Sequence, residues 1–123
     1  MEAYVRTSGI RQKTGVPYVI LGGGSNVLLA DEGYPGLVIL NHMNKVRFHS
    51  HSVTAESGVL ISKVAILAAR HNLGGISGLA TVPGTTGGAV FGNAGVPDMC
   101  INDIFMHAEI LPADGNAPII IGP

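Results

Sequence analysis

"YVILGGGSNVLLAD", residues 18–31, places three consecutive glycines between two apolar runs. Glycine loses more conformational freedom on folding than any other residue, so three in a row are costly to order. Glycine also lets another group approach the backbone, and successive inward-turned N–H groups form a concavity that binds anions. Ser25 and Asn26 add polar side chains directly after the glycines. The stretch predicts either a tight turn between two strands or a site for a phosphate or pyrophosphate.

The glycine run differs from two common nucleotide-binding motifs. No Gly-Lys-Ser/Thr follows it, so it is not a P-loop. Strand-like apolar residues rather than a helix come next, which is unlike the GxGxxG fingerprint.

Composition excludes several classes of protein. The 123 residues are 46% hydrophobic, which is enough for one modest core. Only 12% are charged, the net charge is −1 and no Lys/Arg cluster occurs, so we expect no nucleic-acid partner. No apolar stretch approaches the ~20 residues of a membrane-spanning helix, and no secretory signal is recognisable. We therefore expect a cytoplasmic protein without a membrane partner. The single cysteine, Cys100, excludes an internal disulfide and is expected to be a buried, unreactive thiol.

Short apolar runs predict the strands. Residues 18–21, 27–30 and 37–40 are expected to form strands buried on both faces and close together in a small sheet. Residues 45–56 alternate loosely, which predicts a hairpin or one long strand. Residues 103–121 predict two strands around a turn at Asp114–Gly115–Asn116.

The best helix is predicted at residues 59–72, and a weaker helical pattern covers residues 2–14. Lys63 and Arg70 lie seven residues apart, so they should share an exposed stripe of the stronger helix. Gly74 and Gly75 offer a left-handed position to end it. Residues 75–95 have no trustworthy period and are expected to form a long functional loop. The fold class is α+β, with small sheets flanked by helices.

A second glycine-rich stretch, "VPGTTGGAVFGNAG" at residues 82–95, strengthens the phosphate interpretation. Pro83–Gly84 favours a turn, Thr85 and Thr86 offer hydroxyl donors, and Gly87–Gly88 allows another close approach to the backbone. Two such loops suit a ligand with two phosphates between apolar or aromatic ends, which describes a dinucleotide.

These two stretches, in this order and about sixty residues apart, resemble the UDP-N-acetylenolpyruvoylglucosamine reductases. The resemblance implies a partial FAD-binding domain of the vanillyl-alcohol-oxidase/PCMH type over residues 1–123, incomplete at both ends and without the family's C-terminal substrate domain. It also implies noncovalent FAD, with its pyrophosphate held across both loops. The implied cofactor-binding residues are Gly22, Gly23, Gly24, Ser25, Asn26, Pro83, Gly84, Thr85, Thr86, Gly87, Gly88 and Asn93.

In that family NADPH reduces the flavin, which passes hydride to UDP-N-acetylglucosamine-enolpyruvate to give UDP-N-acetylmuramate for peptidoglycan. The resemblance therefore implies a reductase with a UDP-sugar as its small-molecule partner. The family's catalytic arginine, serine and glutamate have no counterpart here, so no catalytic residue is assigned and these residues alone are expected to be inactive. Ser77, Thr81 and "GVPD" at residues 95–98 depart from the family pattern.

Two alternatives remain open: another FAD-linked, oxidase-type flavoprotein, and a non-catalytic FAD-binding module or remnant. The histidines offer no stronger hypothesis. His49 and His51 could pair on a metal, but no third ligand is evident, so we expect a solvent-facing strand and no metal site. His71 is expected to stabilise the C-terminus of the helix, where positive charge is favourable.

Overall fold

The chain divides into two compact units in the computed structural model, which describes residues 13–112, 114 and 116–123. The first unit comprises residues 1–19, 29–39 and 105–123, and the second comprises residues 20–28 and 40–104. Residues 2–12 of the predicted N-terminal helix lie outside the described residues. No helix in the described part of the chain is long and apolar enough to cross a bilayer.

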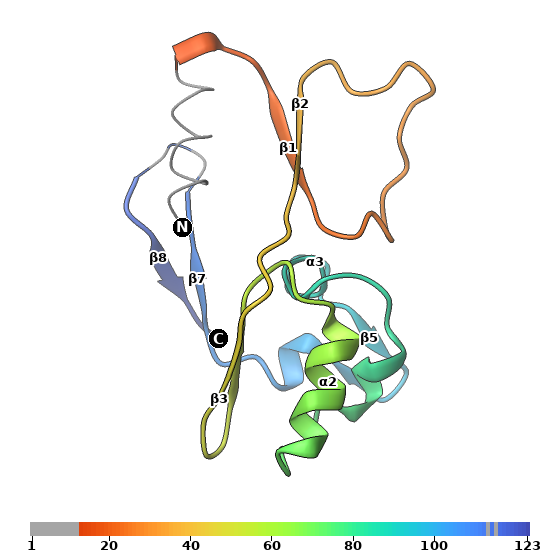
Figure 1. Ribbon diagram of the computed structural model, residues 1–123, viewed down its shortest axis with the longest axis vertical. Coiled ribbons are helices and arrows are strands. Elements are labelled where there is room, and N and C mark those ends of the chain that lie inside the picture. The colour runs from red at the N-terminus through yellow and green to blue at the C-terminus, as the bar shows by residue number, and fades with distance from the viewer. Residues whose placement is uncertain (1–12, 113, 115) are drawn as a thin grey trace. The chain divides into compact units, whose positions relative to one another are not determined.

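Strands β1 (Tyr18–Leu21) and β2 (Leu37–Leu40) form a two-stranded sheet (Figure 1). The Leu37 N–H donates to the Pro17 carbonyl (2.9 Å) and the Asn41 N–H to the Leu21 carbonyl (2.8 Å), so the strands run parallel. The strands predicted at 18–21 and 37–40 are confirmed.

The predicted third strand, residues 27–30, is wrong. These residues have no regular structure, and Leu28 is 98% exposed. A short apolar run shows that burial would be favourable, but a strand also needs a partner for its backbone. Residues 37, 38 and 40 of β2 are exposed as well, so the expected burial on both faces is wrong for that strand.

Two antiparallel hairpins follow the prediction closely. Strands β3 (Val46–Phe48) and β4 (Val53–Ala55) pair within the second unit, and β7 (Ala108–Ile110) and β8 (Ile119–Ile121) pair within the first (Figure 1). At the second hairpin's turn, the Asn116 N–H donates to Asp114 Oδ1 (3.0 Å), while Gly115 lies outside the described residues.

The β3–β4 turn corrects the interpretation of two histidines. His49 and His51 lie in the turn, not on one strand face, and the His49 N–H donates to the Ser52 carbonyl (2.9 Å). No group of three or more metal-ligating side chains is found among the described residues.

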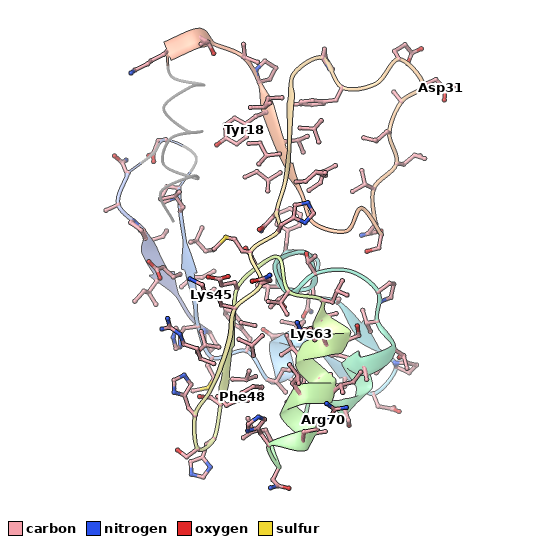
Figure 2. The ribbon with its side chains drawn as sticks, in the orientation of Figure 1. Tyr18, Asp31, Lys45, Phe48, Lys63 and Arg70 are labelled. Carbon is pink, nitrogen blue, oxygen red and sulfur yellow. The ribbon has the colours of Figure 1, made fainter. Side chains whose placement is uncertain are left out.

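The core of the second unit is built on helix α2 (Ile61–Arg70), which confirms the best predicted helix with narrower bounds. Its buried face packs on the short 3-10 helix η1 (Ser77–Thr81). Ile61 and Leu79 are the largest fully buried side chains, and burying each contributes roughly 1.5–3 kcal/mol. Lys63 and Arg70 are exposed on α2, as predicted (Figure 2). The buried apolar residues are Val59, Ile61, Val64, Ala65, Ala68, Ile76, Leu79, Ala89 and Ile101.

Helix α2 ends in a left-handed residue, but that residue is not a glycine. Asn72 has φ +58° and its N–H donates to the Ala69 carbonyl (3.1 Å). The Leu73 N–H reaches back to the Ala68 carbonyl (2.9 Å), which completes a Schellman motif. Asparagine tolerates this conformation better than most residues with a Cβ. The prediction that Gly74 or Gly75 takes the left-handed position at the end of this helix is therefore wrong, because Asn72 takes it.

The last residue before this motif, His71, is the C-cap of α2, which confirms its position at the helix end. Its ring also stacks on Phe48 of β3, with centroids 3.8 Å apart and planes 8° apart. This contact ties the hairpin to the helix, and no local sequence signal predicted it.

The predicted loop at residues 75–95 contains regular structure. It holds η1 and helix α3 (Thr86–Phe91), and it leads into the hairpin of β5 (Gly95–Val96) and β6 (Met99–Cys100). The glycines at 87 and 88 argue against a helix by propensity, but Thr85 caps its start. Cys100 is half-buried rather than buried and precedes a 3-10 turn, η2 (Ile101–Asp103).

Candidate cofactor site

The first loop, residues 22–26, leaves strand β1 directly, and all five residues are exposed. Leu21, the last residue of the strand, is fixed by the hydrogen bond from the Asn41 N–H to its carbonyl. Gly24 has φ +69°, a conformation that favours glycine. Among the described hydrogen bonds, none uses the N–H of residues 22–26. These backbone donors therefore have no described partner within the protein.

The second loop, residues 83–88, is fastened to the core of its unit. The Gly84 carbonyl accepts from the Ile61 N–H (3.1 Å), and the Thr86 N–H donates to the Val59 carbonyl (2.7 Å). Val59 and Ile61 are buried, and they lead into α2. The buried start of helix α2 therefore sets the position of this loop.

The two loops lie against each other within the second unit. A Cβ built on Gly22 would overlap the Thr85 hydroxyl, and one on Gly84 would lie 2.6 Å from Ser25 Oγ. A Cβ on Gly23 would meet only the Gly84 Cα, at 4.0 Å. The structure thus brings together two glycine-rich segments that lie about sixty residues apart in the sequence.

The hydroxyl groups of the second loop are engaged within the fold. Thr85 is 6% exposed, and its Oγ1 accepts from the Gly88 N–H (3.5 Å) at the start of α3. The Thr86 hydroxyl donates to the Val59 carbonyl (2.9 Å). In this structure the Thr86 proton is therefore used within the fold. Both threonines shape the loop.

Gly87 allows a close approach, but its neighbour is protein. A Cβ on Gly87 would lie 2.7 Å from Ser57 Cβ and 3.1 Å from the Ser57 carbonyl oxygen. The Gly87 N–H donates to that same oxygen (2.8 Å). The absence of a side chain at position 87 is thus explained by packing on Ser57. Gly88, in contrast, is exposed.

The remaining predicted residues lie at the rim of the second loop or beyond α3. Pro83 is exposed. Asn93 has φ +45°, and its Oδ1 accepts from the Asn102 N–H (2.9 Å), so its side chain has a structural use. The departures Ser77 and Thr81 are both exposed on η1.

The chemistry available between the loops is that of neutral backbone and hydroxyl dipoles. Residues 22–26 and 83–88 contain no charged side chain. Exposed successive N–H groups can bind an anion through their dipoles, whereas proton transfer or nucleophilic attack needs side chains that these segments lack. The arrangement can hold a phosphate-containing ligand, and it supplies no acid or base of its own.

Comparison with known proteins gives the chain its relatives. The model of the FAD binding domain family matches residues 2–117. A UDP-N-acetylenolpyruvoylglucosamine reductase from Clostridium perfringens is 39% identical over 116 residues, covering 94% of this chain and 38% of the relative. The Clostridium novyi protein of the same name is 41% identical over 112 residues, covering 90% of this chain and 36% of the relative.

A solved structure shows the same fold. The crystal structure of UDP-N-acetylenolpyruvylglucosamine reductase from Thermus caldophilus superposes with a TM-score of 0.74 at 33% identity, covering 92% of this chain and 41% of that one. The chain therefore spans well under half the length of the relatives that it matches. The fold class expected from the sequence, an α+β FAD-binding domain of the PCMH type, is confirmed.

Proposed function

The chain belongs to the FAD-binding domain family, and on that premise we propose that it supplies the FAD-binding part of a UDP-N-acetylenolpyruvoylglucosamine reductase. That enzyme would use NADPH to reduce UDP-N-acetylglucosamine-enolpyruvate to UDP-N-acetylmuramate in the cytoplasm. Its partner would be this UDP-sugar. The observation that carries the proposal is the pairing of the loops at 22–26 and 83–88 within one unit.

The geometry of the first loop fits a bound pyrophosphate. Apart from adjacent residues of the chain, Gly23 has no protein atom closer than 4.0 Å to where its Cβ would be, and Gly24 has none within 4 Å. A ligand can therefore approach the backbone at both residues. The residues of the loop are exposed and their N–H groups make no described hydrogen bond, so these groups are available to phosphate oxygens.

We divide the cofactor-binding residues by what they do. Gly22, Gly23, Gly24, Ser25 and Asn26 would contact FAD through backbone N–H groups and, at 25 and 26, side chains. Thr85, Thr86 and Gly87 would hold the second loop in place, because their own contacts are internal. Pro83, Gly84, Gly88 and Asn93 complete the proposed set.

FAD, once bound, supplies the hydride chemistry of such an enzyme. The described residues of this chain then bind and orient it noncovalently. No residue is assigned a catalytic role, since the loops contain no ionisable side chain.

Titration of the chain with FAD, followed by flavin fluorescence, tests the proposal. Gly23→Val places a branched side chain where the fold leaves room but the ligand would lie, so the Kd should rise at least about tenfold. Gly74→Val is the matched control: it is also an exposed glycine with no atom within 4 Å of its Cβ position, and it follows α2. Its Kd should equal that of the wild type. Unchanged affinity in Gly23→Val would refute the assignment of this loop.

A further inference from the structure

We propose that Asn41 is a positioning residue that holds the two cofactor loops at a fixed separation, acting through Ser57. This inference rests on the proposed function, because the role matters only if the loops bind FAD. Asn41 follows strand β2 and belongs to neither glycine-rich stretch.

Asn41 reaches the base of the first loop through its backbone. Its N–H donates to the carbonyl of Leu21 (2.8 Å), the residue immediately before Gly22. Its side chain is oriented by the Met43 N–H, which donates to Asn41 Oδ1 (3.0 Å). The side-chain amide nitrogen is thereby directed away from Met43.

That nitrogen reaches the second loop through one intermediate. Asn41 Nδ2 donates to Ser57 Oγ (2.8 Å), and this hydrogen bond is partly buried. The Ser57 carbonyl accepts from the Gly87 N–H (2.8 Å), and Ser57 Cβ packs where a Cβ of Gly87 would lie. Asn41 is thus two hydrogen bonds from Gly87.

Together with the contact between the loops, these hydrogen bonds form a closed ring of contacts. Leu21 leads to Gly22, which lies against Thr85, and Thr85 leads back to Gly87 along the second loop. The segments on either side of the side-chain bond also pack tightly, because a Cβ on Gly58 would lie 2.8 Å from the Asn41 carbonyl oxygen. A closed ring of short contacts fixes the distance between the loops, whereas the Gly22–Thr85 contact alone would let the loops rotate about it.

The test compares three variants of the chain. Asn41→Ala removes the side-chain donor and acceptor but leaves the backbone bond to Leu21. Asn41→Asp can still accept a hydrogen bond from the Met43 N–H, and its second carboxylate oxygen can accept one from the Ser57 hydroxyl. This variant should therefore keep the link between residues 41 and 57. Asn116→Ala is the matched control, because it deletes a side-chain bond of the same kind, Asn116 Nδ2 to Asp114 Oδ2 (2.6 Å), in the other unit.

Two readouts are measured: the amide exchange rate of Gly87 without FAD, by NMR, and the Kd for FAD. Asn41→Ala should speed Gly87 exchange and raise the Kd, each about tenfold, since a partly buried hydrogen bond is lost. Asn41→Asp should keep the Gly87 exchange rate and the Kd for FAD near their wild-type values, and Asn116→Ala should change neither. Ser57→Ala should match Asn41→Ala, and the double variant should be no worse than either single one.

Unchanged Gly87 exchange in both Asn41→Ala and Ser57→Ala would overturn the inference, as would additive effects in the double variant. If Asn41→Ala does not fold, Ser57→Ala and Asn41→Asp decide the matter by the same readouts. A wild-type chain that binds no FAD would overturn the proposed function and the role toward FAD, while Gly87 exchange would still show whether Asn41 ties the loops.

Discussion

Gly84 faces Ser25 where the two cofactor loops meet, and a Cβ at position 84 would lie 2.6 Å from the Ser25 hydroxyl oxygen. Gly84 also has φ +105°, a backbone conformation that residues with a Cβ rarely adopt. Ser25 is exposed and can rotate away at little cost, so backbone strain is the larger obstacle to a side chain at position 84. Glycine is therefore required at position 84 chiefly by the conformation of the backbone.

Replacing Gly84 with alanine should lower the free energy of unfolding by about 1–2 kcal/mol, because an L side chain is strained at this φ. Urea denaturation measures the change. Gly23→Ala is the matched control, since its Cβ would meet nothing closer than 4.0 Å. It should leave stability within about 0.5 kcal/mol or raise it slightly, because alanine orders more cheaply than glycine. Equal losses in the two variants would show that the argument from φ is wrong.

Asn72 offers a comparison at the end of helix α2. Asn72→Gly removes a Cβ from a left-handed residue at φ +58° and should leave the protein as stable or more stable by a few tenths of a kcal/mol. Asn72→Ala should destabilise it by roughly 1 kcal/mol, because alanine lacks the polar side chain that helps asparagine adopt this conformation. Thermal unfolding distinguishes the two. A more stable Asn72→Ala variant would contradict the role given to the Schellman motif.

Asp103 predicts a pH dependence. Its Oδ2 accepts from the Cys100 N–H (2.8 Å), and this backbone bond, followed by one from the Cys100 thiol, lowers the pKa of the carboxyl below its ordinary value. A lowered pKa in the folded state gives stability that is present above the unfolded pKa and is lost as the pH falls through the folded pKa. Asp103→Asn should therefore be less stable than the wild type at neutral pH.

The difference in Tm between Asp103→Asn and the wild type should shrink as the pH falls below the ordinary aspartate range. Asp98→Asn, at an exposed aspartate in the β5–β6 turn, is the control for loss of a surface charge and should have nearly the Tm of the wild type at neutral pH. A gap for Asp103→Asn that stays constant down to acid pH would mean that the carboxylate charge is not what stabilises η2.

The sequence predicted best where one local signal decides the structure. The helix at α2 has a strong apolar pattern with Lys63 and Arg70 outside it, and both hairpins follow from alternating segments around turn residues. The prediction of a strand at residues 27–30 was wrong, because an apolar run does not show whether a neighbouring strand is available to pair with it. Helix α3 was not predicted, because residues 75–95 show no period long enough to indicate a helix and two of its six residues are glycines.

The candidate site was likewise predictable from the sequence only in part. Its residue types and the FAD-binding family were accessible, because glycine-rich loops and their order along the chain are properties of the sequence. The contacts that position the loops could not be predicted from the sequence, since Asn41 and Ser57 are sixteen positions apart and neither carries a local signal. The Gly87 contact with Ser57 and the Thr86 bond to Val59 depend on the folded core in the same way.

The last prediction concerns turnover by these 123 residues alone. The reductase family that the sequence resembles places an arginine, a serine and a glutamate against the developing charge, and we expect none of the three to have a counterpart among these residues. Arg47 and Arg70, the two described arginines, are exposed on β3 and α2, outside both cofactor loops. A missing general acid typically costs on the order of a hundred- to ten-thousand-fold in rate. Loss of substrate positioning can remove roughly 7–11 kcal/mol of barrier lowering.

Together these losses should leave no measurable reduction of the substrate, even when the chain holds FAD. The measurement is NADPH oxidation by the purified chain with excess FAD, with and without UDP-N-acetylglucosamine-enolpyruvate, compared with free FAD at the same concentration. We expect the three rates to coincide, because hydride transfer without positioned groups is no faster than the background reaction. Substrate-dependent oxidation well above the free-flavin rate would show that catalytic groups lie within these residues, and the exposed arginines would be the first to replace.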